Sequence, residues 1–508
     1  MRELGIFTDG TICAPATIPG TGAISIIRVS GEDSLAIADK VIEVKGGSLS
    51  ETEGYRLRYG TIFADDGSVL DNVIVSVFRA PHSYTGENSV EISCHASRFI
   101  VNAVLELLVN AGARIAAPGE FTRRAFVNGK MDLAQAEAVA DVIASQSAAS
   151  HKVAMNQLKG GFSSELRVLR EKLLTMTSLL ELELDFSEED VEFASRSELG
   201  ALVEETLTHI VRLTDSFSRG NAIKNGVPVA IVGATNTGKS TLLNALLGEE
   251  RAIVSDIAGT TRDTIEETLN LGGVMFRFID TAGIRETDEV VEKIGIERTF
   301  RKLNEASIVL GMTDLSRGED AVLADAEYIW DKVNASSSDR EFVLLVNKCD
   351  VDGIESVAAG SGTGCVETGS EAGYAETGSE ACCAGKAGKM ARIEAALREK
   401  GIVIKMIPIS AKTGSGLPEL TEALAEIGRR ITGDTDETLV TNIRHYEALS
   451  RAATALGRVR DGLKVATLPP DLIAQDLREA LYHLGEIVGE ISTDEVLGNI
   501  FRKFCIGK

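Results

Sequence analysis

The sequence lacks the features of a membrane or exported protein. No apolar run reaches the 18 or more residues of a membrane span. The N-terminus, MRELGIFTDGTIC, has no uninterrupted apolar stretch after its charged residues, so it does not resemble a secretory signal. We therefore expect a soluble protein that stays in the cytoplasm and has no membrane span.

The sequence is also short of basic residues. It contains 52 Lys and Arg against 76 Asp and Glu, a formal net charge of −24. Because phosphate backbones are bound through Lys and Arg, this balance argues against tight binding of a nucleic acid by the chain alone. Any nucleic-acid substrate would need a local basic patch or a partner protein.

The seven cysteines form no CxxC pair and no Cys/His spacing typical of a metal site. An odd number scattered over a long chain fits reduced thiols better than a disulfide framework. What is present is the composition of a folded protein, with 44% hydrophobic and 25% charged residues. At roughly 150 residues per domain, the 508 residues predict about three domains.

The first segment, residues 1–126, predicts an α+β domain. Strand-like runs bounded by turn residues occur at AISIIRVSG, YRLRYGTIFA, DNVIVSVFRA and SVEISCH. Residues 96–111 then have helical spacing, with Val104 and Leu108 on one apolar face. We expect this helix to pack on the sheet.

Two helical blocks follow, at 127–225 and 434–508. In the first, apolar residues recur at spacings of three and four, at Leu166, Leu169, Leu173, Met176 and Leu180. This stripe fits the core of an internal bundle better than a coiled coil between chains. Because an α/β pattern separates the two blocks, we expect both to form one all-α domain into which the α/β domain is inserted.

Residues 226–433 alternate buried-strand runs with helical ones, as a doubly wound α/β domain does. The strand runs are VPVAIVG, VMFRFID, SIVLGMTD, EFVLLVNK and IVIKMIPIS. Residues 352–388 break this pattern with ETGSEA twice and no apolar period, so we expect a disordered insertion there. A metal or redox site at Cys365, Cys382 and Cys383 is disfavoured, because the segment lacks histidine and ligand spacing.

A phosphate-binding motif lies at the start of the α/β domain. The run GATNTGKS, from Gly233 to Ser240, matches GxxxxGKS between a buried strand and a helix. In such a P-loop, backbone N–H groups face phosphate oxygens, Lys239 reaches the β and γ phosphates, and Ser240 ligates magnesium. Taken alone, this motif leaves both ATP and GTP open.

Two switch-like elements follow the P-loop. The run DTAG, Asp280 to Gly283, comes after a strand and places a carboxylate beside the phosphates. Thr260 and Thr261 lie between the two motifs, on a loop suited to closing over the γ-phosphate.

The last two signatures select the base. Asp350, in the run NKCD that starts at Asn347, can accept from both N1–H and N2–H of guanine. Adenine presents an acceptor at N1, so an ATPase is disfavoured. The run SAK, Ser410 to Lys412, follows the last strand and is expected to support the base through its backbone.

The water-activating residue is not in its usual place. Position 284 is isoleucine, where Ras-like enzymes have the glutamine that orients the attacking water. Catalysis therefore needs another group, and the nearby acids are Glu286, Asp288, Glu289 and Glu292. Most of these are expected to be solvated loop residues.

Taken together, these segments resemble the bacterial and organellar tRNA uridine-5-carboxymethylaminomethyl modification GTPases. The resemblance spans nearly the whole chain outside residues 352–388. Its most specific parts are DGTICAPATIPGTGAISIIRVSG, PHSYTGENSVEI, PGEFTRRAFVNGKMDLAQAEAVAD and the terminal CIGK. It implies a potassium-dependent GTPase that adds an aminomethyl or carboxymethylaminomethyl group to C5 of the wobble uridine of certain tRNAs. The one-carbon unit would come from 5-formyl- or 5,10-methylene-tetrahydrofolate.

The resemblance also implies partners. It implies a homodimer joined through the N-terminal domains, with GTPase domains that approach one another when potassium and GTP are bound. It further implies a hetero-oligomer with an FAD-containing flavoprotein, to which an acidic chain can leave much of the tRNA binding.

In the GTPase domain the resemblance assigns roles to individual residues. Glu292 would be the catalytic residue that orients the water, and Ser240 and Thr261 would hold magnesium. The potassium ligands would be Asn236, Ser255, Ile257 and Thr260, with Ile257 acting through its carbonyl. Together with the signatures, the GTP contacts would be Asn236, Thr237, Gly238, Lys239, Ser240, Thr241, Ser255, Asp256, Ile257, Ala258, Gly259, Thr260, Thr261, Asp280, Thr281, Ala282, Gly283, Asn347, Lys348, Cys349, Asp350, Ser410, Ala411 and Lys412.

For the folate, the matching positions are Arg28, Glu91, Lys130 and Lys508. Cations suit the glutamyl carboxylates of a folate and a carboxylate suits the donor edge of its pterin. Cys505 fits either a nucleophile or an ordinary apolar residue. The tRNAs concerned, the nitrogen donor and the order of steps stay open. The alternative reading is a switch GTPase of ribosome assembly or signalling, without one-carbon chemistry.

Overall fold

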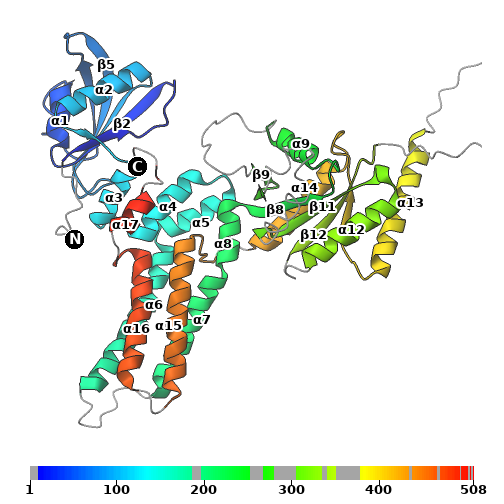
Figure 1. Ribbon diagram of the computed structural model, residues 1–508. Coiled ribbons are helices and arrows are strands. Elements are labelled where there is room, and N and C mark those ends of the chain that lie inside the picture. The colour runs from blue at the N-terminus through cyan, green and yellow to red at the C-terminus, as the bar shows by residue number, and fades with distance from the viewer. Residues whose placement is uncertain are drawn as a thin grey trace, which may run out of the picture. The chain divides into compact units, whose positions relative to one another are not determined.

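The computed structural model describes residues 10–185, 196–251, 267–279, 305–334, 340–350, 378–433, 437–465, 469–491, 494–501, 504 and 507. The chain divides into two compact units. The first contains residues 1–145, 152–216 and 438–508, and the second contains 146–151 and 217–437. Each is described separately below (Figure 1).

The first unit begins with a seven-stranded sheet in the order β3-β4-β5-β6-β2-β1-β7. Its strands are β1 (Ile12–Pro15), β2 (Ile24–Ser30), β3 (Ile42–Val44), β4 (Arg56–Phe63), β5 (Val69–Phe78), β6 (Ser89–His95) and β7 (Arg114–Ile115). Neighbouring strands are antiparallel, apart from the parallel β1–β7 pair. The four strand runs predicted from the sequence form β2, β4, β5 and β6.

The two faces of this sheet differ. Helices α1 (Ser34–Val41) and α2 (Arg98–Asn110) cover one face, where Val75, Ile92 and Leu108 are fully buried. On the other face, Leu57 and Tyr59 of β4 and Ile74 of β5 are exposed, and Tyr59 pairs directly with Ile74. Buried and exposed residues alternate along these strands, as they do in a sheet covered on one side.

The rest of this unit is helical. Its helices are α3 (Glu120–Val127), α4 (Leu133–Ala144), α5 (Ala148–Leu158, from residue 152 onward), α6 (Gly161–Asp185), α7 (Arg196–Asp215), α15 (Ile443–Leu463), α16 (Pro470–Val488) and α17 (Asp494–Phe501). α6 and α7 pack with α15 and α16 as a bundle. The stripe from Leu166 to Leu180 is buried in it, which confirms the predicted bundle core. None of the helices within the described ranges is long and apolar enough to cross a membrane.

A small apolar core joins segments that are far apart in sequence. Phe126 at the end of α3 and Leu133 at the start of α4 pack with Phe501 and Phe504 near the C-terminus. Gly489, which ends α16 with φ 83°, has no room for a side chain, since a Cβ would lie 2.8 Å from Phe126 and from Leu133. The two helical blocks therefore share one core.

The second unit contains a six-stranded sheet in the order β13-β12-β11-β8-β10-β9. Its strands are β8 (Val227–Gly233), β9 (Glu267–Leu271), β10 (Val274–Ile279), β11 (Ile308–Asp314), β12 (Glu341–Asn347) and β13 (Lys405–Pro408). All neighbouring pairs are parallel except β9 with β10. Its helices are α8 (Phe217–Asn225), α9 (Lys239–Arg251), α12 (Glu319–Asn334), α13 (Gly378–Glu399) and α14 (Leu417–Thr432), with the 3₁₀ turn η3 at Leu315–Arg317.

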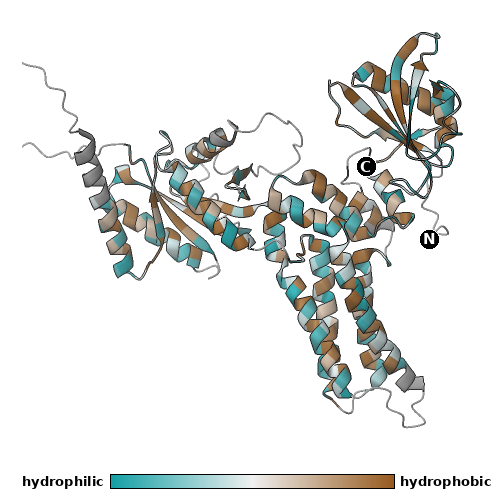
Figure 2. Cartoon of the chain, turned by 180° about the vertical axis from the view of Figure 1, so that it is seen from behind, coloured by the Kyte–Doolittle hydropathy of each residue, from teal (hydrophilic) through white to brown (hydrophobic). Residues whose placement is uncertain are grey.

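Both faces of this sheet are covered. One apolar cluster holds Leu242 of α9 and Leu424 of α14, and another holds Val322 of α12 and Ile393 of α13. Every residue of β11 is buried. Hydrophobic residues accordingly run continuously along the central strands (Figure 2), as they do in parallel sheets covered on both sides.

Two expectations need correction. The segment 352–388 is not irregular throughout, because α13 begins at Gly378 and takes in its last residues, while residues 351–377 lie outside the described part of the chain. This stretch is rich in Ala, a strong helix former, and helix propensity is independent of an apolar period. The α/β unit also begins at α8 and not at residue 226, since Ala222 is buried in the same core as Val229.

A cluster of charged residues connects α4 with the start of α15 and the end of α16. The Glu137 carboxylate on α4 accepts from Arg444 at 2.9 and 3.0 Å and lies 2.6 Å from His445 Nε2. Arg444 also donates to the carbonyls of Glu486 and Ile487 at the end of α16. Burial alone would raise the pKa of Glu137, but His445 and Arg444 outweigh it and lower the pKa from 4.5 to about 2. Glu137 and Arg444 together thus join the helices α4, α15 and α16.

We expect Glu137→Gln to destabilise the helical domain by about 3 kcal/mol, because the half-buried Arg444 is left without its counter-charge. Since the folded-state pKa is depressed, this stabilisation is complete above pH 4.5 and is lost as the pH falls towards 2. Calorimetry of wild type and variant across that range should show the difference shrinking at acid pH. The control Glu447→Gln, in the exposed pair with Arg451, should change little. Equal unfolding of Glu137→Gln and wild type would contradict the assignment.

Candidate functional site

The loop between β8 and α9 has the geometry of a phosphate-binding loop. It follows the buried strand directly and ends at Lys239, the first residue of α9. Asn236 and Gly238 have positive φ values of 61° and 99°, which turn the chain tightly. Gly233 must be glycine, since a Cβ would lie 2.3 Å from the Met312 carbonyl oxygen. The backbone N–H groups at the start of α9 are therefore available to an anion.

Lys239 lies over this loop. Its Nζ donates to the carbonyls of Gly233 at 2.9 Å and Ala234 at 2.7 Å, and burial lowers its pKa. Thr237 donates its hydroxyl to Ala234 as well. A phosphate at this loop would meet a cation whose hydrogen-bond partners among the described residues are neutral carbonyl groups. The residues present therefore fit a nucleotide phosphate.

Asn347 links the phosphate loop to the base-binding segments. It ends β12, the neighbour of β11, and is buried. Its Nδ2 donates to the Thr237 carbonyl at 2.7 Å, and its Oδ1 accepts from the Ala411 backbone N–H at 3.0 Å. The Cys349 N–H donates to the Ile409 carbonyl at 3.2 Å. The structure thus brings together three of the predicted signatures, the P-loop, NKCD and SAK.

Lys348 is held by a residue that the sequence analysis did not identify. Lys348 has a left-handed backbone, with φ 63°, and its Nζ lies 2.6 Å from Asp314 Oδ2 at the end of β11. Burial alone would raise the pKa of Asp314, but hydrogen bonds from Lys348 and Ser316 lower it. The ammonium is therefore fixed beside the base-binding segment. The available signal was the position of Asp314 at the carboxyl end of a central strand.

The other predicted nucleotide residues fall into two groups. Ser240 and Thr241 lie in the first turn of α9, Ser410 is buried, and Asp350 and Lys412 are exposed on the loops that follow β12 and β13. The remaining predictions lie outside the described residues, namely Ser255, Asp256, Ile257, Ala258, Gly259, Thr260, Thr261, Asp280, Thr281, Ala282, Gly283 and Glu292.

The first unit contains a second candidate site, around Arg28 on β2. Arg28 and Glu91 are register partners on adjacent strands, and both Nε and Nη2 of Arg28 lie 2.9 Å from Glu91 Oε1. The guanidinium lies 5.0 Å from the Tyr84 ring centre and 5.6 Å from that of Phe121. Its Nη1 is buried and has no hydrogen-bond partner among the described residues. This orphaned donor fits a ligand with an acceptor group.

Of the two other predicted folate residues, the structure describes Lys130 and does not describe Lys508. Lys130 is exposed, and its Nζ donates to the Pro81 carbonyl at 3.0 Å, in the loop that carries Tyr84. Lys508 and Cys505 lie outside the described residues. Gly507 is buried, and a Cβ there would lie 2.1 Å from the Pro15 carbonyl oxygen at the end of β1. The structure thus joins Arg28 with Glu91 and links Lys130 to the same loop.

A strand, a tight loop, a lysine and a helix at the carboxyl edge of a parallel sheet define the class of P-loop nucleotide-binding proteins. The comparisons then give the family. The family described as "MnmE helical domain" matches residues 133–505, and that described as "GTP-binding protein TrmE N-terminus" matches residues 11–130.

Full-length relatives agree with this result. Proteins named "tRNA modification GTPase MnmE" include one from Parabacteroides distasonis, 49% identical over 501 residues, which are 98% of this chain and 100% of that protein. Another, from Bacteroides fragilis, is 50% identical over 500 residues, or 98% and 99% of the two chains. A third, from Porphyromonas gingivalis, is 46% identical over 512 residues and covers 100% of both. The chain belongs to the MnmE family of tRNA modification GTPases.

We expect Asn347→Ala to weaken nucleotide binding at least about tenfold. The substitution leaves the Thr237 carbonyl and the Ala411 N–H without their partner, and each buried group left unpaired costs about 1–3 kcal/mol. Titration calorimetry with GDP measures the change. Asn334→Ala, at the exposed end of α12, is the matched control and should bind as wild type does. The two hydrogen bonds from Asn347 to Thr237 and Ala411 form what we call the Asn347 clamp. Unchanged binding by Asn347→Ala would refute its role in nucleotide binding.

Proposed function

We propose that this protein is a GTPase that modifies tRNA. The observation that carries the nucleotide part is the Asn347 clamp, which holds the phosphate loop and the base-binding segments together through Thr237 and Ala411. Membership of the MnmE family and the names of the relatives support tRNA as the substrate.

The nucleotide is proposed to be GTP with magnesium. Asp350 follows the Asn347 clamp and is exposed on the loop after β12, a position that suits a carboxylate accepting from the two donors of guanine. Lys239 supplies positive charge at the phosphates, and Ser240 in the first turn of α9 suits a magnesium ligand. Thr261 is proposed as the second magnesium ligand.

Hydrolysis is proposed to depend on potassium and Glu292. Asn236 is exposed on the phosphate loop in a left-handed conformation, which suits a side-chain oxygen ligand beside the phosphates. Ser255, Ile257 and Thr260 would complete the potassium site. A monovalent cation there supplies positive charge where other GTPases use an arginine, and Glu292 would orient the water.

A reduced folate is proposed to bind at Arg28. The buried Nη1 offers a donor, Glu91 Oε2 an acceptor, and Lys130 an exposed cation nearby. This combination suits a ligand with a pterin amide edge and carboxylates, such as 5-formyl- or 5,10-methylene-tetrahydrofolate. Lys508 would add a further cation. A site of this kind supports one-carbon chemistry over the alternative of a switch GTPase.

We propose that the protein forms a homodimer through the open face of the first sheet. Leu57, Tyr59 and Ile74 are 69%, 54% and 49% exposed there, and clustered exposed apolar residues mark interaction sites. The row that starts at Leu57 continues across the paired strands through Glu91 to Arg28, so this face includes the proposed folate site. An FAD-containing partner is proposed to supply the basic tRNA surface that a chain of charge −24 lacks.

The test of the proposed function is nucleoside analysis of tRNA. We expect a strain that lacks this chain to lose a C5-modified wobble uridine, as measured by mass spectrometry of digested tRNA, and the wild-type chain to restore it. Lys239→Ala should fail to restore it, because the phosphates lose their cation. An unchanged nucleoside profile in the deletion strain would refute the function.

We expect Asp350→Asn to weaken GTP binding by about a hundredfold, because two charge-assisted hydrogen bonds to guanine are lost. The same change should improve binding of xanthosine triphosphate, whose C2 carbonyl accepts from the new amide. Competition binding measures both ligands, and the exposed Asp331→Asn on α12 is the control. Retained preference for GTP in Asp350→Asn would exclude the proposed base contact.

We expect GTP hydrolysis to be about a hundredfold faster in potassium chloride than in sodium chloride at equal ionic strength. A loss of this size is typical when one preorganised charge-stabilising group is missing. Turnover measured by phosphate release gives the ratio, and Asn236→Ala should reduce it. Equal rates in the two salts would contradict the cation role.

A further inference from the structure

The loop between β5 and β6, residues 79–88, forms one wall of the site around Arg28. Tyr84 lies at its centre, and its ring is 5.0 Å from the Arg28 guanidinium carbon. The Tyr84 hydroxyl lies 2.8 Å from the Thr122 hydroxyl on α3. Phe121, the residue before Thr122, lies near the same guanidinium at 5.6 Å. The loop and α3 therefore flank Arg28 with aromatic rings.

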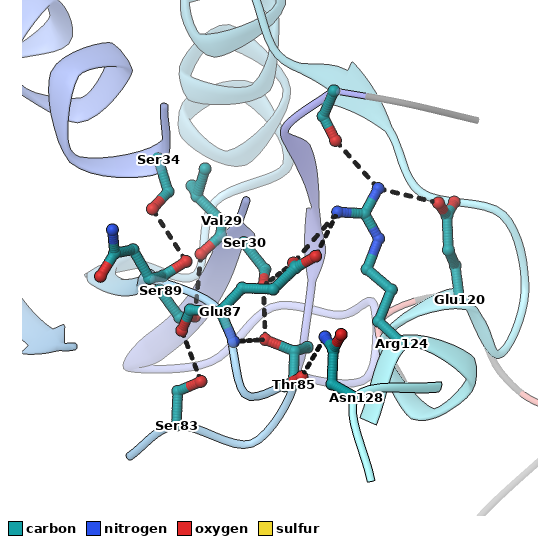
Figure 3. A network of polar contacts seen from close by, with 12 residues as sticks. Val29, Ser30, Ser34, Ser83, Thr85, Glu87, Ser89, Glu120, Arg124 and Asn128 are labelled. Carbon is teal, nitrogen blue, oxygen red and sulfur yellow. Dashed lines mark hydrogen bonds and ion pairs between the residues drawn. The ribbon is translucent and has the colours of Figure 1, made fainter. Parts of the chain in front are cut away.

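The loop is fastened to its surroundings by a buried polar network (Figure 3). The Glu87 carboxylate accepts from Arg124 Nη1 at 3.0 and 3.2 Å and from the Ser30 hydroxyl at 2.9 Å. Ser30 and Thr85 hydroxyls lie 2.7 Å apart, and Asn128 Nδ2 donates to the Thr85 carbonyl at 2.8 Å. The residues that follow Tyr84 are thus held from both the sheet and α3.

Arg124 is the centre of this network. Its side chain is 10% exposed, and besides Glu87 its Nη2 donates to the Gly10 carbonyl at 2.9 Å and lies 3.2 Å from Glu120 Oε1. Glu120 in turn pairs with Arg114. Burial alone would raise the pKa of Glu120, but hydrogen bonds from Arg114 and the Ala117 N–H, with the charges of both arginines, lower it to about 2. Two arginines and two carboxylates balance each other, so the network is a stable anchor.

We propose that Tyr84 is a positioning residue for Arg28, and that the Glu87–Arg124 ion pair keeps Tyr84 in place. The proposal rests on the proposed reduced-folate site and adds three positions to it, Tyr84, Glu87 and Arg124. Arg28 is fixed by Glu91 on one side and by the Tyr84 ring on its face, so that Nη1 is aimed before any ligand arrives. A donor held in its binding orientation loses less entropy on binding, which strengthens affinity.

The first experiment measures binding of 5-formyltetrahydrofolate to the full-length chain by titration calorimetry. We expect Tyr84→Leu to bind about tenfold more weakly, in line with the loss of one buried cation–π contact. Tyr84→Phe keeps the ring and loses only the hydroxyl contact with Thr122, so it should restore near wild-type affinity. A loss of equal size in both variants would overturn the role of the ring.

A double-mutant cycle tests whether Tyr84 acts through Arg28. In an Arg28→Gln background, Tyr84→Leu should cause no further loss, because the group that it positions is already missing. If Tyr84→Leu weakens binding by the same factor in both backgrounds, Tyr84 does not act through Arg28 and the proposal fails.

The second experiment tests the ion pair. A lysine at position 124 keeps the charge but cannot reach Glu87, Gly10 and Glu120 at the same time. We expect Arg124→Lys to speed amide hydrogen exchange in residues 82–88 and to weaken folate binding about fivefold. Arg123→Lys is the matched control, because Arg123 makes none of these side-chain contacts in the described structure. Exchange in residues 82–88 that equals wild type would overturn this part.

The outcomes distinguish failure of the proposed folate site from failure of the positioning role of Tyr84. If the wild-type chain does not bind 5-formyltetrahydrofolate, the proposed folate site is wrong and this inference falls with it. If wild type binds and Tyr84→Leu binds equally well, the folate site stands and the positioning role alone is refuted.

Discussion

The nucleotide site depends on one side-chain amide. Asn347 is buried at the end of β12, where it donates to the Thr237 carbonyl of the phosphate loop and accepts from the Ala411 N–H after β13. These segments are far apart in sequence, and parallel strands bring their carboxyl ends to one edge of the sheet. A buried amide that satisfies two backbone groups fixes their spacing, because either group would be costly to leave unpaired.

In the site around Arg28, charged side chains fix the neighbouring segments, as the Asn347 amide does in the nucleotide site. Arg28 is aimed by Glu91 and Tyr84, and the loop that carries Tyr84 is held by the ion pair between the half-buried Glu87 and the buried Arg124. Asp350 and Lys130, which are proposed to touch ligands, are exposed, whereas Asn347 and Arg124, which hold neighbouring segments in place, are buried. Preorganisation of this kind needs a rigid supporting layer.

Much of this fold is predictable from the sequence. Buried runs such as VPVAIVG and EFVLLVNK predict β8 and β12 within one residue, because strands covered on both faces are continuously apolar. The strands β1, β3, β7 and β9 were missed, since two to five residues carry little or no period. The helix over 378–388 was missed because it shows propensity without an apolar pattern. Motif spacing predicts Lys239 and Asn347. Glu87 and Arg124 could not be predicted, because their partners are chosen by tertiary contacts between distant segments.

The small core in which Phe126 and Leu133 meet Phe501 and Phe504 has a consequence for biosynthesis. A ribosome makes its first two members before the α/β unit and its last two after it. The early helices therefore keep apolar surface uncovered while the whole α/β unit is being made, until residues 501–504 have been translated. The core of the helical domain closes only after the α/β unit has been synthesised, so a chaperone that shields this surface in the meantime would improve the yield of native protein.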